Sequence, residues 1–358
     1  MSGIVQVAVG LAELGGAAHL GRLLARALAD YATARGLSFE VLDLGGGDPD
    51  LPGIARRAFV GDRSAFARAV ALRQVRDRPR LVLFDHLGPA RVQALLPSAL
   101  RARYGVVVLG IEVWRPLEWQ RRRALKLAER VLAISETTLA QARPFLPAGV
   151  ETAVVHPALE DPGTRGAADE LLLHRCGDGF VLVVGRLDRD PKGHDALFAA
   201  LAHLRAKVPT ARLVVAGGGS DQRRLERLAV EVGVGEGVLF TGAVSAATLA
   251  ELYARCAVFC MPATTEGFGL VFVEAMKAGK PCIALAGTAP AEIVVDGETG
   301  LLLADASPEA LASSLAWLLA SPARARRLGA GGRLRYEREF TAAAFAGRLR
   351  PHLDAMLA

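Results

Sequence analysis

Short, continuous apolar runs alternate with longer segments of helical periodicity along the whole chain. Continuous runs are typical of parallel strands that helices cover on both faces, whereas strands with one exposed face alternate apolar and polar residues. In the first half of the chain the predicted strands are 4–10, 39–44, 81–86, 105–110, 130–135 and 152–157. In the second half they are 180–185, 212–218, 238–242, 257–262, 281–285 and 300–305.

Helical segments separate several of these strands. The predicted helices are 20–31, 120–130, 194–207 and 222–232. This alternation favours an α/β fold with two Rossmann-like, doubly wound parallel-sheet domains, and a polar segment at 158–170 divides them. We therefore predict an N-terminal domain at 1–160, a C-terminal domain at 161–335, and a final helix at 336–358 that packs back onto the first domain.

Length and composition narrow the class of protein. A chain of 358 residues suits two domains, and its longest charge-free segments, such as 237–250, have 14 residues. A membrane-spanning helix needs about 20 apolar residues, and the N-terminus lacks the basic region of a signal peptide. The four cysteines lie in apolar runs, which fits buried free thiols in a reducing compartment. We expect a cytoplasmic location.

The basic charge is unevenly distributed. Residues 1–165 contain 22 Lys and Arg against 16 Asp and Glu, whereas 166–358 contain 21 of each, so the first half carries the whole formal charge of +6. Two interpretations stay open: a solvated arginine-rich face, or attraction to an anionic bilayer surface or a phosphate-bearing substrate. Nucleic acid is not expected, because no aromatic residues are interleaved with the basic ones.

Glycine-rich turns follow four of the predicted strands. They are Gly15-Gly16, Gly185-Arg186, Gly217-Gly218-Gly219 and Glu266-Gly267-Phe268-Gly269. Any single turn can be an ordinary strand-to-helix connection, but ligands of open α/β sheets bind where such turns meet. Four turns divided between two domains predict a ligand in a central cleft that the domains face. Arg186 and Lys192 lie close to helix starts, where cations and free N–H groups would together hold a diphosphate.

Two glutamates interrupt the most apolar of these segments, 264–281. A helix that begins near Leu270 would bury Glu274 among apolar neighbours, and an unpaired buried carboxylate is costly. Hydrogen bonds from a ribose diol would satisfy it. The alternative is that Glu266 caps the helix and Glu274 pairs with a nearby Lys or Arg.

The spacing of Glu266 and Glu274 resembles the E-x7-E signature of retaining, nucleotide-sugar-dependent glycosyltransferases of family 4, which have the GT-B fold. The resemblance includes "EGFGLVFVEAMKAGKPCIA", "VVGRLDRDPKGHDAL" and "LVVAGGG", and it covers almost all of the second half. The first half is similar only through shorter motifs, such as "LVLFDH" and "GIEVW".

The resemblance implies a role for each matching residue. Glu274 would accept hydrogen bonds from the ribose, and Arg186 and Lys192 would neutralise the diphosphate. Glu266 and the backbone of 267–270 would hold the donor sugar and the β-phosphate. The complete set implied to bind the donor is Gly16, Gly185, Arg186, Lys192, Gly217, Glu266, Gly267, Phe268, Gly269, Leu270 and Glu274. The resemblance also implies that no metal ion is needed. No cofactor is implied either, because the nucleotide sugar is a co-substrate.

The sequence departs from the family at one position. Members often carry a histidine before a glycine in the first domain, where this chain has Leu109-Gly110. We therefore take His86 as the candidate catalytic or acceptor-positioning residue, beside Glu266, Arg186 and Lys192. Other functions stay open: a sugar phosphorylase, or a sugar-nucleotide-binding protein with little activity. A dinucleotide-dependent oxidoreductase is disfavoured, because no G-x-G-x-x-G follows a strand.

The family resemblance and the basic first half together suggest the acceptor. We expect a glycan or a lipid-linked saccharide, as in the synthesis of cell-surface polysaccharides. A peripheral position at the inner membrane face is the alternative to a purely cytoplasmic one.

Overall fold

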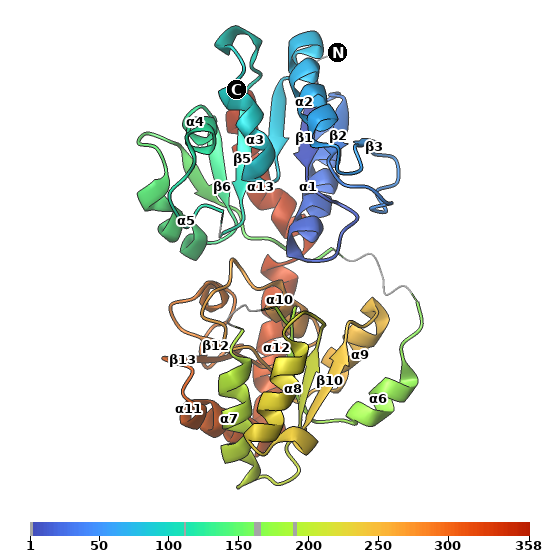
Figure 1. Ribbon diagram of the computed structural model, residues 1–358, viewed down its shortest axis with the longest axis vertical. Coiled ribbons are helices and arrows are strands. Elements are labelled where there is room, and N and C mark those ends of the chain that lie inside the picture. The colour runs from blue at the N-terminus through green and yellow to red at the C-terminus, as the bar shows by residue number, and fades with distance from the viewer. Residues whose placement is uncertain (1–2, 111, 161–165, 189–191) are drawn as a thin grey trace. The chain divides into compact units, whose positions relative to one another are not determined.

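The computed structural model describes residues 3–110, 112–160, 166–188 and 192–358 (Figure 1). The chain forms two compact units. Unit 1 contains Met1–Glu160 together with Phe340–Ala358, and unit 2 contains Asp161–Glu339. Both are built on parallel sheets, as the continuous apolar runs predict.

Unit 1 contains a seven-stranded sheet in the order β3-β2-β1-β4-β5-β6-β7, with every pairing parallel. The strands are β1 Ile4–Ala8, β2 Phe39–Asp43, β3 Ala55–Ala58, β4 Leu81–Phe84, β5 Tyr104–Val108, β6 Arg130–Ala133 and β7 Thr152–Val154. Central strands β1, β4 and β5 are buried along their whole length.

The sequence prediction misses β3. This edge strand reads Ala-Arg-Arg-Ala, is mostly exposed, and pairs only with β2. An edge strand needs no continuous apolar run, because helices do not cover both of its faces. Hydrophobic patterning therefore carries no signal for it.

Helices in unit 1 are α1 Gly16–Thr33, α2 Arg63–Asp77, α3 Leu87–Ala90, α4 Trp119–Lys126, α5 Glu136–Ala142 and α13 Ala342–Leu357. Figure 1 shows α1 beside α13, and Tyr31 on α1 donates a hydrogen bond to Asp354 on α13 (2.6 Å). The predicted helix start at 336 is wrong. Helix α12 extends to Glu339 in unit 2, and α13 begins only after Thr341, whose side chain caps it.

Unit 2 contains a six-stranded parallel sheet in the order β10-β9-β8-β11-β12-β13. The strands are β8 Val181–Val184, β9 Leu213–Ala216, β10 Val238–Gly242, β11 Val258–Cys260, β12 Cys282–Leu285 and β13 Gly300–Leu303. The helices are α6 Glu170–Cys176, α7 His194–Arg205, α8 Gln222–Glu231, α9 Ala246–Arg255, α10 Leu270–Lys277, α11 Pro308–Leu319 and α12 Pro322–Glu339. The four cysteines are buried free thiols, which confirms the prediction from their apolar context. None of the helices in the described ranges is both long and apolar enough to span a bilayer.

Candidate active site

The turn before α10 has a glycine at the helix boundary. Gly269 is the N-cap, with φ of 105°, a conformation that glycine adopts far more readily than other residues. A Cβ at this position would lie 3.0 Å from Cδ2 of Phe272, so packing also selects glycine. The helix begins at Leu270, as predicted, and no side chain caps it. Its first-turn N–H groups form an end of partial positive charge that favours anions.

Glu266 and Lys192 form an ion pair in unit 2. Lys192 Nζ lies 2.7 Å from Glu266 Oε2, and the N–H of Gly267 donates to Glu266 Oε1 (3.2 Å). Both side chains are largely buried. The structure therefore brings together two residues that the sequence assigns to the donor sugar and the diphosphate. Glu266 does not cap α10, so that alternative is wrong.

Glu274 lies on α10 and accepts a hydrogen bond from Tyr253, on α9 (2.8 Å, Tyr253 Oη to Glu274 Oε2). Burial raises the pKa of the Glu274 carboxyl, whereas the hydrogen bond from Tyr253 and the charge of Lys277 lower it. The hydrogen-bond donor is thus a neutral hydroxyl, and the charge of Lys277 acts on the carboxyl as well. The alternative interpretation, a pairing of Glu274 with a nearby Lys or Arg, stays a prediction. Sequence reasoning misses Tyr253, because no spacing rule connects residues on two different helices.

Arg186 follows strand β8 and is an exposed residue. Its side chain is 82% exposed and forms an ion pair with Asp188 (3.7 Å). No hydrogen bond or ion pair joins Arg186 to Glu266, Glu274 or Lys192 in the described part of the chain. The predicted pairing of Arg186 with Lys192 around a diphosphate stays a prediction.

Gly217 and Gly219 pack the loop after β9 against the loop after β8. A Cβ on Gly217 would lie 2.0 Å from the carbonyl oxygen of Gly185, and one on Gly219 would lie 2.3 Å from that of Leu187. Backbone contact alone therefore accounts for both glycines. The predicted role of Gly217 in donor binding is not needed to explain that glycine, whereas a Cβ on Gly185 would meet nothing within 4 Å. Both roles in donor binding stay predictions.

In unit 1, His86 caps the short helix α3. Its Nδ1 accepts a hydrogen bond from the N–H of Gly88 (2.9 Å). Burial lowers the pKa of the imidazole, with Glu112 raising it and Arg121 lowering it further. A neutral ring that accepts at Nδ1 carries its proton on Nε2, so it can donate to a ligand through Nε2 but cannot act there as a base.

Leu109 and Gly110 stand where members of the family often carry a histidine and a glycine. The N–H of Leu109 donates to the buried carboxylate of Glu112 (2.5 Å). Gly110 has φ of 144°, and a Cβ there would lie 2.9 Å from the Trp114 ring. Leu109 and Gly110 are thus held by Glu112 and Trp114.

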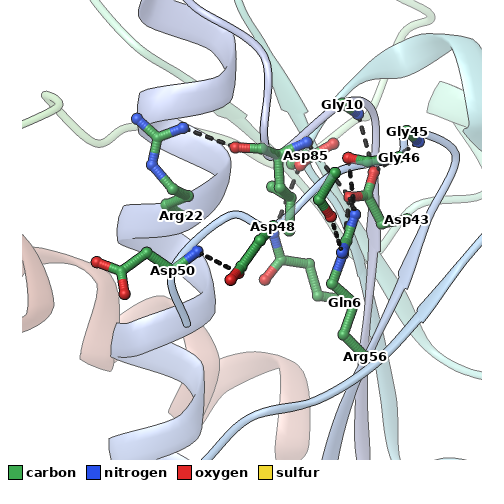
Figure 2. Close-up of polar contacts among 12 residues, drawn as sticks. Gln6, Gly10, Arg22, Asp43, Gly45, Gly46, Asp48, Asp50, Arg56 and Asp85 are labelled. Carbon is green, nitrogen blue, oxygen red and sulfur yellow. Dashed lines mark hydrogen bonds and ion pairs between the residues drawn. The ribbon is translucent and has the colours of Figure 1, made fainter. Parts of the chain in front are cut away.

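Gly16 is the exposed first residue of α1, and Gly15 is the N-cap, with φ of 116°. The loop that leads to them is anchored at its start (Figure 2). Asp43 Oδ1 accepts from the N–H of Gly10 (2.9 Å), and Arg22 Nη1 donates to the carbonyl of Leu11 (2.6 Å). The predicted approach of Gly16 to a phosphate stays a prediction.

Asp43 is the acidic residue at the end of β2 (Figure 2). Dinucleotide-binding folds use an acid of this kind to hydrogen-bond a ribose. Here the buried carboxylate pairs with Arg56 (2.7 Å) and accepts from the N–H groups of Gly10 and Gly45. Its hydrogen-bonding capacity is occupied within the protein, which further disfavours the dinucleotide alternative.

No group of three or more His, Cys, Asp or Glu side chains among the described residues could hold a metal ion.

Comparison with known proteins finds sequence similarity over the second unit. The sequence profile of the family "Glycosyl transferases group 1" matches residues 169–335. A GDP-mannose-dependent alpha-(1-6)-phosphatidylinositol monomannoside mannosyltransferase from Mycolicibacterium smegmatis is 38% identical over 198 residues, 52% of this chain and 50% of that protein. A D-inositol 3-phosphate glycosyltransferase from Xylanimonas cellulosilytica is 37% identical over 193 residues, 52% of this chain and 45% of that protein. The chain thus spans about half the length of the curated relatives it matches.

Solved structures resemble the chain over almost its whole length. Sucrose-phosphate synthase from Thermosynechococcus elongatus has a TM-score of 0.81 and 26% identity, covering 99% of this chain and 100% of that one. HepE of Anabaena, in complex with UDP and glucose, has a TM-score of 0.79 at 18% identity over 99% of this chain and 100% of that one, which shows the fold alone. These similarities confirm the GT-B fold and the resemblance to family 4. The chain has the GT-B fold, and its residues 169–335 match the family model of the glycosyl transferases group 1.

Proposed function

We propose that this chain is a retaining glycosyltransferase that moves a hexosyl group from a UDP- or GDP-sugar to a hydroxyl acceptor. The observation that carries the proposal is the arrangement at the start of α10. Glu266, with Lys192, lies before the glycine turn, and Glu274 lies on the helix that follows it. Relatives named for GDP-mannose and a structural neighbour that holds UDP and glucose are consistent with such a donor.

Leaving-group stabilisation is the chemistry that this arrangement favours. As the bond between the sugar and the β-phosphate breaks, negative charge develops on the diphosphate. Lys192, Arg186 and the first-turn N–H groups of α10 would stabilise that charge, and preorganised donors are most effective where charge develops. Glu274 would accept from the ribose diol and Glu266 from the sugar.

Retention follows if the acceptor oxygen attacks the face from which the diphosphate departs. The new bond joins the anomeric carbon to the acceptor oxygen, and the departing phosphate takes the acceptor proton. This route needs no protein base, which agrees with a His86 ring that carries its proton on Nε2.

The proposal is tested with a panel of UDP- and GDP-sugars and saccharide acceptors. We expect release of nucleoside diphosphate with one donor and, by NMR, a product with the anomeric configuration of that donor. Inverted product would contradict the retaining mechanism. Release of a sugar 1-phosphate in the presence of inorganic phosphate would instead indicate a phosphorylase.

We further propose that unit 1 makes peripheral contact with an anionic membrane, where a lipid-linked acceptor would be found. On α4, Trp119 is 62% exposed and lies close in sequence to the exposed Arg122, Arg123 and Lys126. Tryptophan and basic side chains favour an anionic bilayer surface. Trp119→Ala should weaken co-sedimentation with phosphatidylglycerol vesicles, and high salt should abolish it. Indifference to anionic lipid would contradict this contact.

A further inference from the structure

We infer that Tyr253 is a positioning residue of the nucleotide site. Its hydroxyl holds Oε2 of Glu274, so that Oε1 can accept hydrogen bonds from the ligand. This inference rests on the proposed function, because it assumes that Glu274 binds the ribose.

The contact joins two helices. Tyr253 is on α9, and its hydroxyl lies 2.8 Å from Glu274 Oε2 and 3.1 Å from the carbonyl oxygen of Val271, both on α10. A hydroxyl has one proton to donate, and a charged carboxylate is the stronger acceptor. The Val271 carbonyl offers a second acceptor when the carboxyl is protonated.

Tyr253 is held rigidly. It is 3% exposed, and its ring centroid lies 5.8 Å from that of Phe259. Phe259 in turn packs edge-on against Phe272 of α10, at 4.9 Å. The hydroxyl is therefore a fixed point to which the longer, more flexible glutamate side chain is bound.

Glu274 keeps unused hydrogen-bonding capacity. Tyr253 occupies one position on Oε2, and no other residue of the described ranges forms a hydrogen bond with this carboxylate. A carboxylate has about four lone-pair positions, so Oε1 is left for two hydroxyl groups of a ligand. The side chain is only partly buried, so that a ligand can reach it.

The electrostatics around the pair agree with this role. Burial raises the pKa of Glu274, and the bond from Tyr253 opposes that effect. Lys277 on α10 lowers it too, and Arg333 on α12 donates to the Lys277 carbonyl. Burial raises the pKa of Tyr253 well above its usual value, with Glu274 and the buried thiols of Cys256 and Cys282 adding to it, so the phenol stays a donor.

Loss of the hydroxyl should then have two consequences. The carboxylate would no longer be oriented, and burial would raise its pKa with less opposition. The charged form that accepts from a ribose would be lost at a higher pH than in the wild type.

The test compares Tyr253→Phe with Tyr336→Phe by calorimetric titration from pH 5 to 8. Tyr336 is a buried tyrosine of unit 2 whose hydroxyl bonds to no other described residue. The ligands are UDP and GDP and their 2′,3′-dideoxy analogues. We expect Tyr253→Phe to weaken binding of the ribonucleotide about tenfold, leave the dideoxy analogue within about twofold, and move the pH midpoint of binding upward. Tyr336→Phe should change none of these.

Several outcomes would overturn the inference. Unchanged ribonucleotide binding by Tyr253→Phe, or an equal loss for the ribo- and dideoxy ligands, would make Tyr253 a merely structural residue. If Tyr253→Phe does not fold, all four tyrosines can be replaced with 3-fluorotyrosine, whose hydroxyl is a stronger donor of nearly the same size. This replacement should lower the pH midpoint of nucleotide binding. An unchanged midpoint would contradict the inference. A wild-type chain that binds neither nucleotide would overturn the proposed function as well.

Discussion

The two units share a parallel topology but use acidic side chains at their strand and helix ends in different ways. In unit 1, Asp43 is fully buried and is occupied by Arg56 and backbone N–H groups. In unit 2, Glu274 accepts a hydrogen bond from Tyr253 alone among the described residues, and Glu266 interacts with Lys192 and with the N–H of Gly267. A carboxylate that only stabilises the fold is saturated within the protein, whereas one that binds a ligand keeps capacity for it.

Replacing Glu274 with alanine should have the largest effect. Loss of two charge-assisted hydrogen bonds to the ribose should weaken UDP or GDP binding on the order of a hundredfold. The fold should persist, because Tyr253 can still donate to the Val271 carbonyl. Calorimetric titration measures the affinity, and Glu231→Ala, an exposed glutamate of the same unit, is the control. Unchanged affinity would show that the ribose binds elsewhere.

Asp43→Asn tests whether the buried carboxylate of Asp43 stabilises the fold. It leaves the largely buried guanidinium of Arg56 without its counter-charge, which should lower the free energy of unfolding by about 3 kcal/mol. Urea unfolding measures the change, and nucleotide affinity should be unaffected. The matched control is Asp77→Asn, which breaks a more exposed pair with Arg73 and should cost less than about 1 kcal/mol. If Asp43→Asn and Asp77→Asn lowered the free energy of unfolding equally, the buried pair would be no more important for stability than the exposed one.

Lys192→Met should slow sugar transfer about tenfold, since it removes one of the several groups proposed to stabilise the diphosphate. The expected signature is a fall in kcat with little change in the affinity for the free nucleoside. Lys207→Met, an exposed lysine of unit 2, should have no effect. A rate that is insensitive to Lys192 would leave the ion pair with Glu266 a purely structural contact.

The buried carboxyl of Asp85 in unit 1 should make stability depend on pH. Burial, with a contribution from Asp43, raises its pKa to about 8, although Gln6 opposes the change. Because the folded state keeps a proton that the unfolded state has lost, stability should fall as the pH rises from about 4 to about 8, by at most about 1.4 kcal/mol per pH unit. Asp85→Asn should flatten this dependence in urea unfolding. A wild-type stability that rises over this range and is matched by the variant would contradict the assignment.

Much of the fold could be predicted from hydrophobic patterning. The continuous runs predict parallel strands in both halves, since burial on two faces requires them. Patterning fails at β3, whose exposed edge position needs no apolar run. It also fails at the last helix, where a threonine cap sets a start that the composition of 336–341 does not reveal.

Less of the candidate site could be predicted. Spacing along the chain gives Glu266, Glu274 and the start of α10, because these depend on local helix geometry. Tyr253 is 21 residues before Glu274, on another helix, and only the packing of α9 against the sheet brings the two together. Gly217 cannot be interpreted from the sequence alone, because a glycine that packing requires looks the same in a sequence as one that a phosphate requires.

Calorimetric titration of the wild-type chain with UDP, GDP and NAD tests the central claim most directly. The arrangement of Glu266, Lys192 and Glu274 predicts that UDP or GDP binds and that NAD does not. Binding of NAD alone would contradict it.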